Sequence, residues 1–496
     1  MTLPTERITT PELTARIRDL EAGSRPLEPD AGERARIRER VLRYTDDFLE
    51  RLPHAPTYNE NRSPVGKLSR FPISEEGRDP EAVVRLLEEA VDGPGINPAS
   101  GGHLGYIPGG GLTEGALGDY IAAITNHYAG IGFAGPGAVA MEQQLLTWMA
   151  ELMGYPEGWG GNLTSGGSIA NLIGVVTARE AKGLRAVDFP RAVVYTTGQV
   201  HHCVEKAVGV AGLGEAVRRR VPTDDRWRMD PEALDRMVRE DRERGRIPWL
   251  LVASAGTTDV GAVDPLKELG QVARAHDLWY HVDGAYGAFF ALCPEVRPLL
   301  DGIQDSDSLV VDPHKGLFLS YGVGAILVRD DRALREAHRY QAAYMQDAQA
   351  LEEWDALSPA ARSPELSKHW RGPRMWLPLM IHGVAPFRAA LDEKRLLARY
   401  FWERARELGF EVGPEPELSV VTYRWLPERG DPNEFNRALV QAIHEDGRLF
   451  VSSTTLDGSF VLRLAVLSFR THLETIDLML EILQEKVAEL EGSTSP

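Results

Sequence analysis

Two charged residues follow apolar runs that are typical of buried strands, and they are the best candidates for chemistry in this sequence. Asp283 ends the run L-W-Y-H-V-D, and Lys315 follows about thirty residues later in V-V-D-P-H-K-G-L. Side chains that follow neighbouring parallel strands emerge at one edge of the sheet, where ligands of such sheets bind. A carboxylate and an amine can therefore face one ligand. Either residue alone is ordinarily a solvated charge, so the prediction depends on the pair.

The segments around these two residues resemble the pyridoxal-phosphate group II amino-acid decarboxylases, which include the aromatic amino-acid, tyrosine and glutamate decarboxylases. The similarity extends from about residue 100 to F-V-L-R-L-A-V around Arg463, and the combination of D-x-A-Y-G with D-P-H-K is specific. The resemblance implies an α/β protein with the type I, aspartate aminotransferase-like fold. It also implies pyridoxal 5′-phosphate (PLP) as the cofactor.

The family's chemistry assigns roles to the matching residues. Lys315 is implied to form a Schiff base with the cofactor aldehyde, and the ring then accepts the electron pair left when a bond at the α-carbon breaks. Asp283 matches the carboxylate that keeps the pyridine nitrogen protonated, because a nearby negative charge favours the charged ring. Ala285 is small and leaves one ring face open to close packing. Lys315, His201 and Asp283 are the predicted catalytic residues.

Further residues match family positions around the ring and the phosphate. His201, in Q-V-H-H-C-V-E-K-A, matches the histidine that stacks on the ring, with the neighbouring His202 as the alternative if the alignment shifts by one residue. Ser254, in A-S-A-G-T-T, and His314 match positions near the phosphate or ring. Asp312 departs from the family pattern, because the animal aromatic enzymes have asparagine at this position. A carboxylate is also unfavourable beside a phosphate. Asp312 stays a candidate cofactor contact.

The segment G-N-L-T-S-G-G-S-I-A-N-L is the predicted phosphate site. Free N–H groups and the partial positive charge at a helix start stabilise a phosphate dianion. Gly166 and Gly167 let the backbone approach, and Ser168 adds a hydroxyl as a helix over 169–178 begins. A Gly-Ser turn is also a common helix cap. A second glycine motif, G-P-G-A-V-A from Gly135, lacks the preceding strand of a dinucleotide site and is interpreted as a loop and helix entry.

The resemblance implies decarboxylation of an L-amino acid, so the protein is predicted to be a carboxy-lyase. Family decarboxylases place a tyrosine on a loop ahead of the segment matching H-W-R-G-P-R-M-W, and counting back from Arg371 puts that position near Ser358. Tyr344 is the nearest upstream tyrosine, and its ordinary interpretation is a helix or loop aromatic. In related enzymes, loss of this tyrosine accompanies aldehyde formation by oxidative deamination. An aldehyde-forming oxidase therefore stays open. An aminotransferase also stays open, because holding the cofactor does not choose the reaction, and so does a catalytically silent interaction protein on this fold.

The substrate is predicted to be aromatic and similar to tyrosine or DOPA. Tyr106, Ile107 and Phe133, near the predicted mouth of the site, suit an aromatic side chain, although such residues line most pockets. Ser367, in L-S-K-H-W-R, matches a position that is serine in some tyrosine-type members and glycine in tryptophan-type ones.

The elements that must position these residues form three predicted parts. Residues 1–100 have apolar positions at helical spacing in 31–52 and 79–91 and are predicted as an N-terminal helical arm. Residues 101–376 are predicted as the large PLP-binding domain, a mainly parallel sheet covered on both faces. Its strand candidates are 191–196, 249–253, 278–282, 308–311 and 324–328, and its residues 331–370 are a candidate mobile loop. Residues 377–496 are predicted as a small α+β domain, with helices at 384–408, 432–444 and 473–490 and strands at 419–425 and 460–466.

Composition narrows the class of protein. The chain has 496 residues and a formal net charge of −18, which repels nucleic acid and anionic membrane surfaces. Its two cysteines, Cys203 and Cys293, cannot build a disulfide framework, and no Cys/His spacing matches a metal site. The start M-T-L-P-T-E-R lacks the features of a signal peptide, and no 18-residue apolar stretch occurs. We therefore expect a cytoplasmic enzyme without a metal, a membrane span or a nucleic-acid partner.

The resemblance also implies a homodimer with shared active sites, because family members pair with the N-terminal arm crossing to the partner. The apolar stripe within residues 31–52 is compatible with that arrangement, since an isolated amphipathic arm must bury its face somewhere. Packing of this stripe on its own chain is the more ordinary interpretation.

Overall fold

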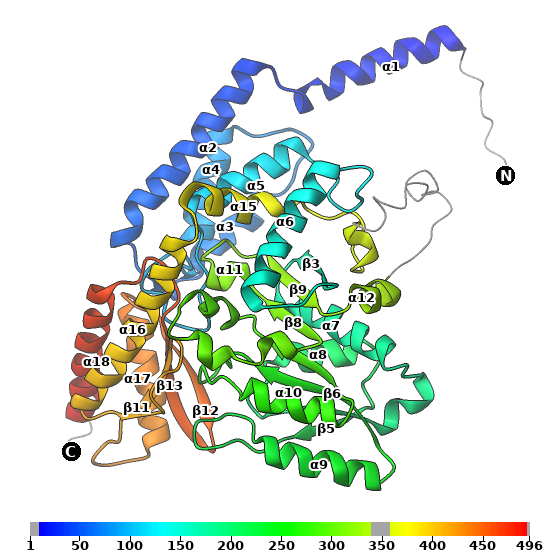
Figure 1. The fold of residues 1–496 in the computed structure, drawn as a ribbon. Coiled ribbons are helices and arrows are strands. Elements are labelled where there is room, and N and C mark those ends of the chain that lie inside the picture. Colours follow the sequence, from blue (N-terminus) through cyan, green and yellow to red (C-terminus); the bar gives the residue numbers. More distant parts are fainter. Residues whose placement is uncertain (1–8, 339–357, 494–496) are drawn as a thin grey trace, which may run out of the picture. The chain divides into compact units, whose positions relative to one another are not determined.

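The computed structural model describes residues 9–338 and 358–493, and its central feature is a seven-stranded sheet in the order β3-β9-β8-β7-β6-β4-β5 (Figure 1). Strands β8, β7, β6, β4 and β5 run parallel, whereas β9 is antiparallel to both β3 and β8. The mainly parallel α/β sheet is thus confirmed. Its strands are β3 (Gly160–Thr164), β4 (Ala192–Thr196), β5 (Val217–Arg220), β6 (Ile247–Ser254), β7 (Trp279–Asp283), β8 (Ser308–Val311) and β9 (Gly324–Val328).

Alternating side chains of the central strands pack against two layers of helices. On β7, Tyr280 and Val282 belong to the core beneath α6, α9 and α10, whereas Trp279 belongs to the core beneath α7, α8 and α12. Because successive strand residues point to opposite faces, burial on both faces requires an almost continuous apolar run. The helices are α6 (Pro136–Met153), α7 (Gly167–Ala181), α8 (His202–Val210), α9 (Pro231–Glu243), α10 (Leu266–Ala275) and α12 (Asp331–His338).

Five strands match the predicted apolar runs, but β3 and β5 were not expected. Strand β3 has the sequence G-G-N-L-T, and a Cβ on its Gly161 would lie 2.7 Å from the carbonyl oxygen of Ile326 on β9. Strand β5 reads V-R-R-R, and its arginines form ion pairs instead of an apolar core. Neither strand carries the alternation by which strands are recognised. Gly135 is the N-cap of α6, as the interpretation of its motif as a helix entry predicted.

A second sheet lies in the C-terminal part of the chain. It is antiparallel, in the order β10-β11-β13-β12, and shares one apolar core with α16, α17 and α18 (Figure 1). The predicted helices and strands of this region are present, and β10 and β12 are additional. The elements are α16 (Ala385–Glu407), β10 (Glu411–Val412), β11 (Val420–Arg424), α17 (Pro432–Asp446), β12 (Ser452–Leu456), β13 (Ser459–Ala465) and α18 (Leu473–Ser493).

The described residues fall into two compact units. One holds the residues up to Ala55 together with 59–95, and the other holds 56–58 and everything after Gly95. In the first unit, α2 packs on α4, with Arg40 paired to Glu81. Its helices are α1 (Thr10–Ser24), α2 (Ala31–Arg51), α3 (Gly66–Ser69) and α4 (Pro80–Leu87). The boundaries near residues 100 and 376 stay predictions.

Three further helices complete the second unit: α5 (Thr113–Thr125), α11 (Pro313–Gly316) and α15 (Gly372–His382). Of the predicted loop over 331–370, residues 339–357 lie outside the described part. Among the residues that the structure describes, no helix is long and apolar enough to cross a membrane, and no group of His, Cys, Asp and Glu is arranged to hold a metal ion.

Candidate active site

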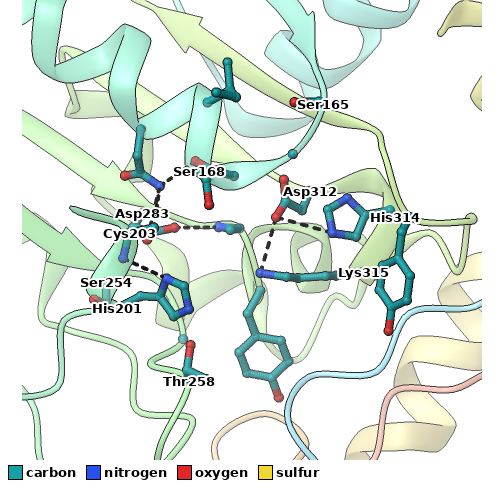
Figure 2. Close-up of a pocket in the computed structure, with 18 of the residues that line it drawn as sticks. Ser165, Ser168, His201, Cys203, Ser254, Thr258, Asp283, Asp312, His314 and Lys315 are labelled. Atoms are coloured by element: carbon teal, nitrogen blue, oxygen red, sulfur yellow. Dashed lines mark hydrogen bonds and ion pairs between the residues drawn. The ribbon is translucent and has the colours of Figure 1, made fainter. Parts of the chain in front are cut away.

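A cavity of about 370 Å³ lies where β6, β7 and β8 end. Parallel α/β sheets bind ligands at this edge, and the volume suits a small molecule. Figure 2 shows the labelled side chains around the cavity, with Asp283 near His201 and Cys203, and Lys315 near Asp312 and His314. Every residue predicted for catalysis or cofactor binding lines it: Gly166, Gly167, Ser168, His201, Ser254, Asp283, Ala285, Asp312, His314 and Lys315.

Lys315 is held on the short helix α11, directly after β8. The adjacent Gly316 packs so closely on Phe289 that a Cβ would lie 2.6 Å from the Phe289 Cβ. The Lys315 Nζ lies 3.2 Å from Asp312 Oδ2, and the lysine side chain is 21% exposed. Burial lowers the pKa of Lys315, but the charges of Asp312 and Asp283 outweigh burial and leave the pKa raised. The amine therefore carries a proton in the free site at neutral pH.

Asp312 lies beside the amine. Its Oδ2 also lies 3.7 Å from His314 Nε2, and its Oδ1 is buried and accepts no hydrogen bond in the described part of the chain. Burial lowers the pKa of His314, which favours a neutral ring. The negative charge of Asp312 is therefore balanced chiefly by Lys315.

Asp283 ends β7 and is held by hydrogen bonds on both oxygens. Its Oδ1 accepts the N–H of Ala285 at 3.1 Å, and its Oδ2 accepts the Asn171 side-chain amide at 3.4 Å. Ser254 is its register partner on β6, and the Ser254 N–H donates to Asp264. These contacts fix a carboxylate on the side of the cavity formed by β6 and β7.

His201, and not His202, lines the cavity. His201 is the N-cap of α8, and its Nδ1 accepts the N–H of Cys203 at 3.3 Å. Burial lowers the pKa of His201, so the ring is neutral and its single hydrogen is on Nε2. His202 is exposed, with its ring centre 4.1 Å from that of His201.

The start of α7 forms another wall of the cavity. Gly166 is its N-cap with φ 144°, a conformation that favours glycine, and no side chain caps the helix. A Cβ on Gly167 would lie 2.8 Å from Asp312 Oδ2. The first N–H groups of a helix have no acceptor within it, so this end is suited to an anion.

Several cavity residues were not predicted. Asn171 is a polar residue in the apolar helical run I-A-N-L-I-G-V-V, and that contrast is the signal by which it could have been found. Cys203 follows H-H, and burial raises the pKa of its thiol, which keeps it protonated. The other lining residues are Ser165, Ile169, Gly256, Thr257, Thr258, Tyr286, Tyr321 and Gly322.

The residues predicted near the mouth of the site, and Ser367, do not line the cavity itself. Among the described residues, Tyr106, Ile107, Phe133 and Ser367 do not line this cavity. Tyr344 lies outside the described part of the chain. Ser358, near the position expected for the loop tyrosine, is buried, and its Oγ accepts the N–H of Gly132 at 3.0 Å.

Comparison with known proteins decides the family. Residues 104–426 match the family model described as the pyridoxal-dependent decarboxylase conserved domain. The chain belongs to the pyridoxal-dependent decarboxylase family. It is 34% identical over 420 residues to the aromatic-L-amino-acid decarboxylase of Bacillus atrophaeus, covering 83% of this chain and 86% of that protein. It is 29% identical to the phenylacetaldehyde synthase of Arabidopsis thaliana, covering 83% of this chain and 87% of that protein.

Solved structures share the fold of this pyridoxal-dependent decarboxylase. TDC of Oryza sativa, solved with PLP and tryptamine, superposes with a TM-score of 0.87 at 25% identity, covering 93% of this chain and 99% of that one. The type I fold predicted from the motifs is thus confirmed. The protein is a carboxy-lyase that uses PLP and acts on an amino acid.

The cavity of this decarboxylase fits PLP. A helix start without a capping side chain suits the phosphate, a carboxylate suits the ring nitrogen, and a lysine amine suits the aldehyde. Gly166 and Gly167 lie where a side chain would narrow the phosphate end.

We predict that Asp312 controls how readily this decarboxylase captures its cofactor. The Lys315 amine must lose its proton before it can attack the PLP aldehyde, so capture by the free enzyme should accelerate as pH rises toward the raised pKa of Lys315. Asp312→Asn removes one of the charges that raise this pKa. Below the pKa of Lys315 the rate profile should shift to lower pH, so capture at pH 7 should become roughly tenfold faster for each pKa unit lost.

The measurement is the absorbance change after rapid mixing of cofactor-free enzyme with PLP, from pH 6.5 to 9. Asp235→Asn, which alters a carboxylate paired with His276 on the helix α9 surface, is the control and should leave the profile unchanged. A capture rate at pH 7 that is the same in Asp312→Asn as in the native enzyme contradicts the prediction.

Proposed function

We propose that the protein decarboxylates an aromatic L-amino acid of the tyrosine or DOPA type. The observation that carries the proposal is the arrangement of Lys315, Asp283 and the uncapped start of α7 around one cavity. When bound, PLP supplies an aldehyde that bonds to an amine and a protonated ring that accepts an electron pair. Lys315 would bind the aldehyde, Asp283 would keep the ring nitrogen protonated, and Gly167 and Ser168 would hold the phosphate.

The remaining roles follow from protonation states. The neutral ring of His201 lines the cavity, so it would border the bound cofactor without adding a charge that competes with the ring nitrogen. Lys315 Nζ and His201 Nε2 both hold hydrogens, and one of them supplies the proton that the α-carbon takes up after CO₂ leaves. Ala285, which is small and buried, lines the cavity and would leave room for the cofactor ring.

The aromatic substrate class is supported by relatives. The Bacillus atrophaeus enzyme is named for aromatic L-amino acids, and the Oryza sativa structure contains tryptamine. Ser367 does not line the cavity of its own chain, but by sequence it matches a serine of some tyrosine-type members, and that match favours a phenolic side chain over an indole.

An aldehyde product is the second candidate function, because a specific feature favours it. The position expected for the loop tyrosine falls near Ser358, where the sequence has no tyrosine, and the Ser358 hydroxyl is bound to the backbone of Gly132. Relatives include a phenylacetaldehyde synthase. Aldehyde formation would consume O₂ and water and release CO₂, ammonia and hydrogen peroxide along with the aldehyde. Decarboxylation alone releases one CO₂ and one amine and consumes no O₂.

A product balance tests both functions. The PLP-loaded enzyme is incubated with L-tyrosine, L-DOPA, L-phenylalanine, L-tryptophan and L-glutamate, and CO₂, amine, aldehyde, ammonia and peroxide are each measured. We expect amine and CO₂ in equal amounts, with tyrosine or DOPA as the best substrate. Aldehyde and ammonia equal to CO₂ would establish the second function, and CO₂ from glutamate alone would overturn the aromatic assignment.

We also propose a homodimer with shared active sites. Exposed apolar side chains lie on α5 and α15, which pack together: Leu117, Tyr120, Ile121, Ile124, Met380 and Ile381. Tyr106 is 57% exposed and has a φ of 56°, held by hydrogen bonds from its N–H to Ser452 and from Arg463 to its carbonyl. Such a strained, exposed aromatic residue outside the cavity of its own chain is suited to complete the cavity of a second copy.

Complementation tests this arrangement. Lys315→Ala and Tyr106→Arg should each be inactive alone, but co-expressed they should regain activity, because a hybrid dimer then has one site with both native residues. Light scattering should give twice the chain mass of 54.8 kDa. A monomer, or a dimer without recovery, contradicts shared sites.

We propose the cytosol as the location. Cys203 and Cys293 are both buried free thiols, which suits a reducing compartment.

A further inference from the structure

A continuous line of buried polar side chains runs behind Asp283. Trp279 Nε1 donates to Ser308 Oγ at 2.8 Å, Ser308 Oγ lies 2.7 Å from His281 Nδ1, and His281 Nε2 lies 2.9 Å from Asn171 Oδ1. Asn171 Nδ2 then donates to Asp283 Oδ2 at 3.4 Å. Trp279 is 7% exposed, and Ser308, His281 and Asn171 have no exposed surface.

The line follows from strand geometry. Trp279, His281 and Asp283 alternate along β7 and therefore point to the same face of the sheet, toward α7. Ser308 is the register partner of His281 on β8. A Cβ on Gly174 of α7 would lie 2.8 Å from His281 Cε1, so this helix packs directly on the imidazole.

The donors and acceptors have only one consistent assignment. Asn171 Nδ2 faces two acceptors, the Gly167 carbonyl at 2.9 Å and the Asp283 carboxylate, so the Asn171 oxygen faces His281. His281 therefore carries its hydrogen on Nε2, and its Nδ1 accepts the hydroxyl hydrogen of Ser308.

The far end of the line agrees with this assignment. The indole of Trp279 can only donate, and Ser308 Oγ accepts from it. Burial lowers the pKa of His281 to about 4, in agreement with a neutral ring. Every hydrogen bond in the line thus points toward the carboxylate.

Asn171 joins two parts of the cofactor site. The same amide nitrogen bonds the carbonyl of Gly167, at the start of α7, and the carboxylate of Asp283, at the end of β7, and it also lies 3.5 Å from Cys203 Sγ. The start of α7 is the proposed phosphate anchor, and Asp283 is the proposed ring-nitrogen anchor. One side chain therefore fixes the spacing between the two anchors.

We propose that Asn171 is a positioning residue, with His281 and Ser308 fixing its amide orientation, that holds Asp283 against the ring nitrogen at a set distance from the phosphate anchor. The inference rests on the proposed function, because it requires Asp283 to meet that nitrogen. Without Asn171, Asp283 loses a charge-assisted donor and the His281 N–H is left without an acceptor in the interior.

Asn171→Leu tests the proposal, since leucine has a similar volume and neither donates nor accepts. We expect PLP to bind about 10- to 100-fold more weakly, the range seen when an outer hydrogen-bond partner of a metal ligand is removed. With ¹⁵N-labelled PLP, the NMR shift of the ring nitrogen should show that it loses its proton at lower pH than in the native enzyme. Ser308→Ala, farther from Asp283 along the line, should change both quantities in the same direction by a smaller factor.

Thr177→Val is the matched control. It removes a buried hydroxyl on the same helix, one that donates to the Ile173 carbonyl at 2.8 Å and is outside the line. It should leave the nitrogen shift and PLP affinity unchanged. If Asn171→Leu does not fold, the ring-nitrogen shift and the PLP affinity of Ser308→Ala are compared with those of Thr177→Val to test the positioning role.

The two possible failures are distinguishable. A ring nitrogen that is unprotonated in the native enzyme contradicts the role of Asp283 itself. A protonated nitrogen whose shift and pH profile are the same in the native enzyme and in folded variants of Asn171 or Ser308 overturns the positioning role alone.

Discussion

Lys315→Ala should reduce the rate of CO₂ release by at least about 10⁴-fold, the scale on which loss of a covalent nucleophile acts in other enzymes. The amine is the covalent anchor of the cofactor and one of the two groups that hold a proton at the reacting carbon. The measurement is the initial rate with saturating PLP and the best amino-acid substrate. Borohydride reduction followed by peptide mass analysis should place the cofactor label on Lys315 in the native enzyme.

The control for this variant is Lys206→Ala, which removes an exposed lysine from α8 near the site and should keep the native rate. Retained activity in Lys315→Ala, or a label on another lysine, would contradict the assignment of Lys315 as the residue that binds the cofactor. A native enzyme that takes up no label at all would contradict the covalent role of Lys315.

Asp283→Asn should lower the rate roughly 10²- to 10³-fold, as expected for the loss of one preorganised electrostatic contact. The variant keeps the shape of the side chain but removes the charge that favours a protonated ring nitrogen. The Ala285 N–H and the Asn171 amide that now donate to the carboxylate would each face a neutral amide. The rate and the PLP dissociation constant should be measured together, because a fall in rate at saturating PLP separates chemistry from binding.

Asp264→Asn is the matched control, because Asp264 is a buried carboxylate that accepts the N–H of Ser254 and does not line the cavity. Asp264→Asn should have a lower free energy of unfolding than the native enzyme, but each folded molecule should keep most of the native rate of CO₂ release. If Asp283→Asn retains native turnover at saturating PLP, the ring nitrogen does not depend on this charge.

The strands that carry the site were predictable because their burial on both faces requires apolar residues. The runs ending at Asp283 and preceding Lys315 are examples, and β7 and β8 pair in parallel as predicted. Strand β5 was missed because ion pairs hold its arginines. Strand β3 was missed because close packing against β9 selects its glycines.

The sequence by itself determined which residues approach the cavity, because a residue that follows a buried parallel strand has only one edge at which to emerge. It also determined the family, through motifs in which glycine, aspartate and lysine have fixed spacing. Only the tertiary structure decided that His201 faces the cavity while His202 faces solvent, because that depends on where α8 begins. Only the tertiary structure placed Asn171 between α7 and β7, since contacts between residues far apart in the chain arise from packing and leave no local pattern.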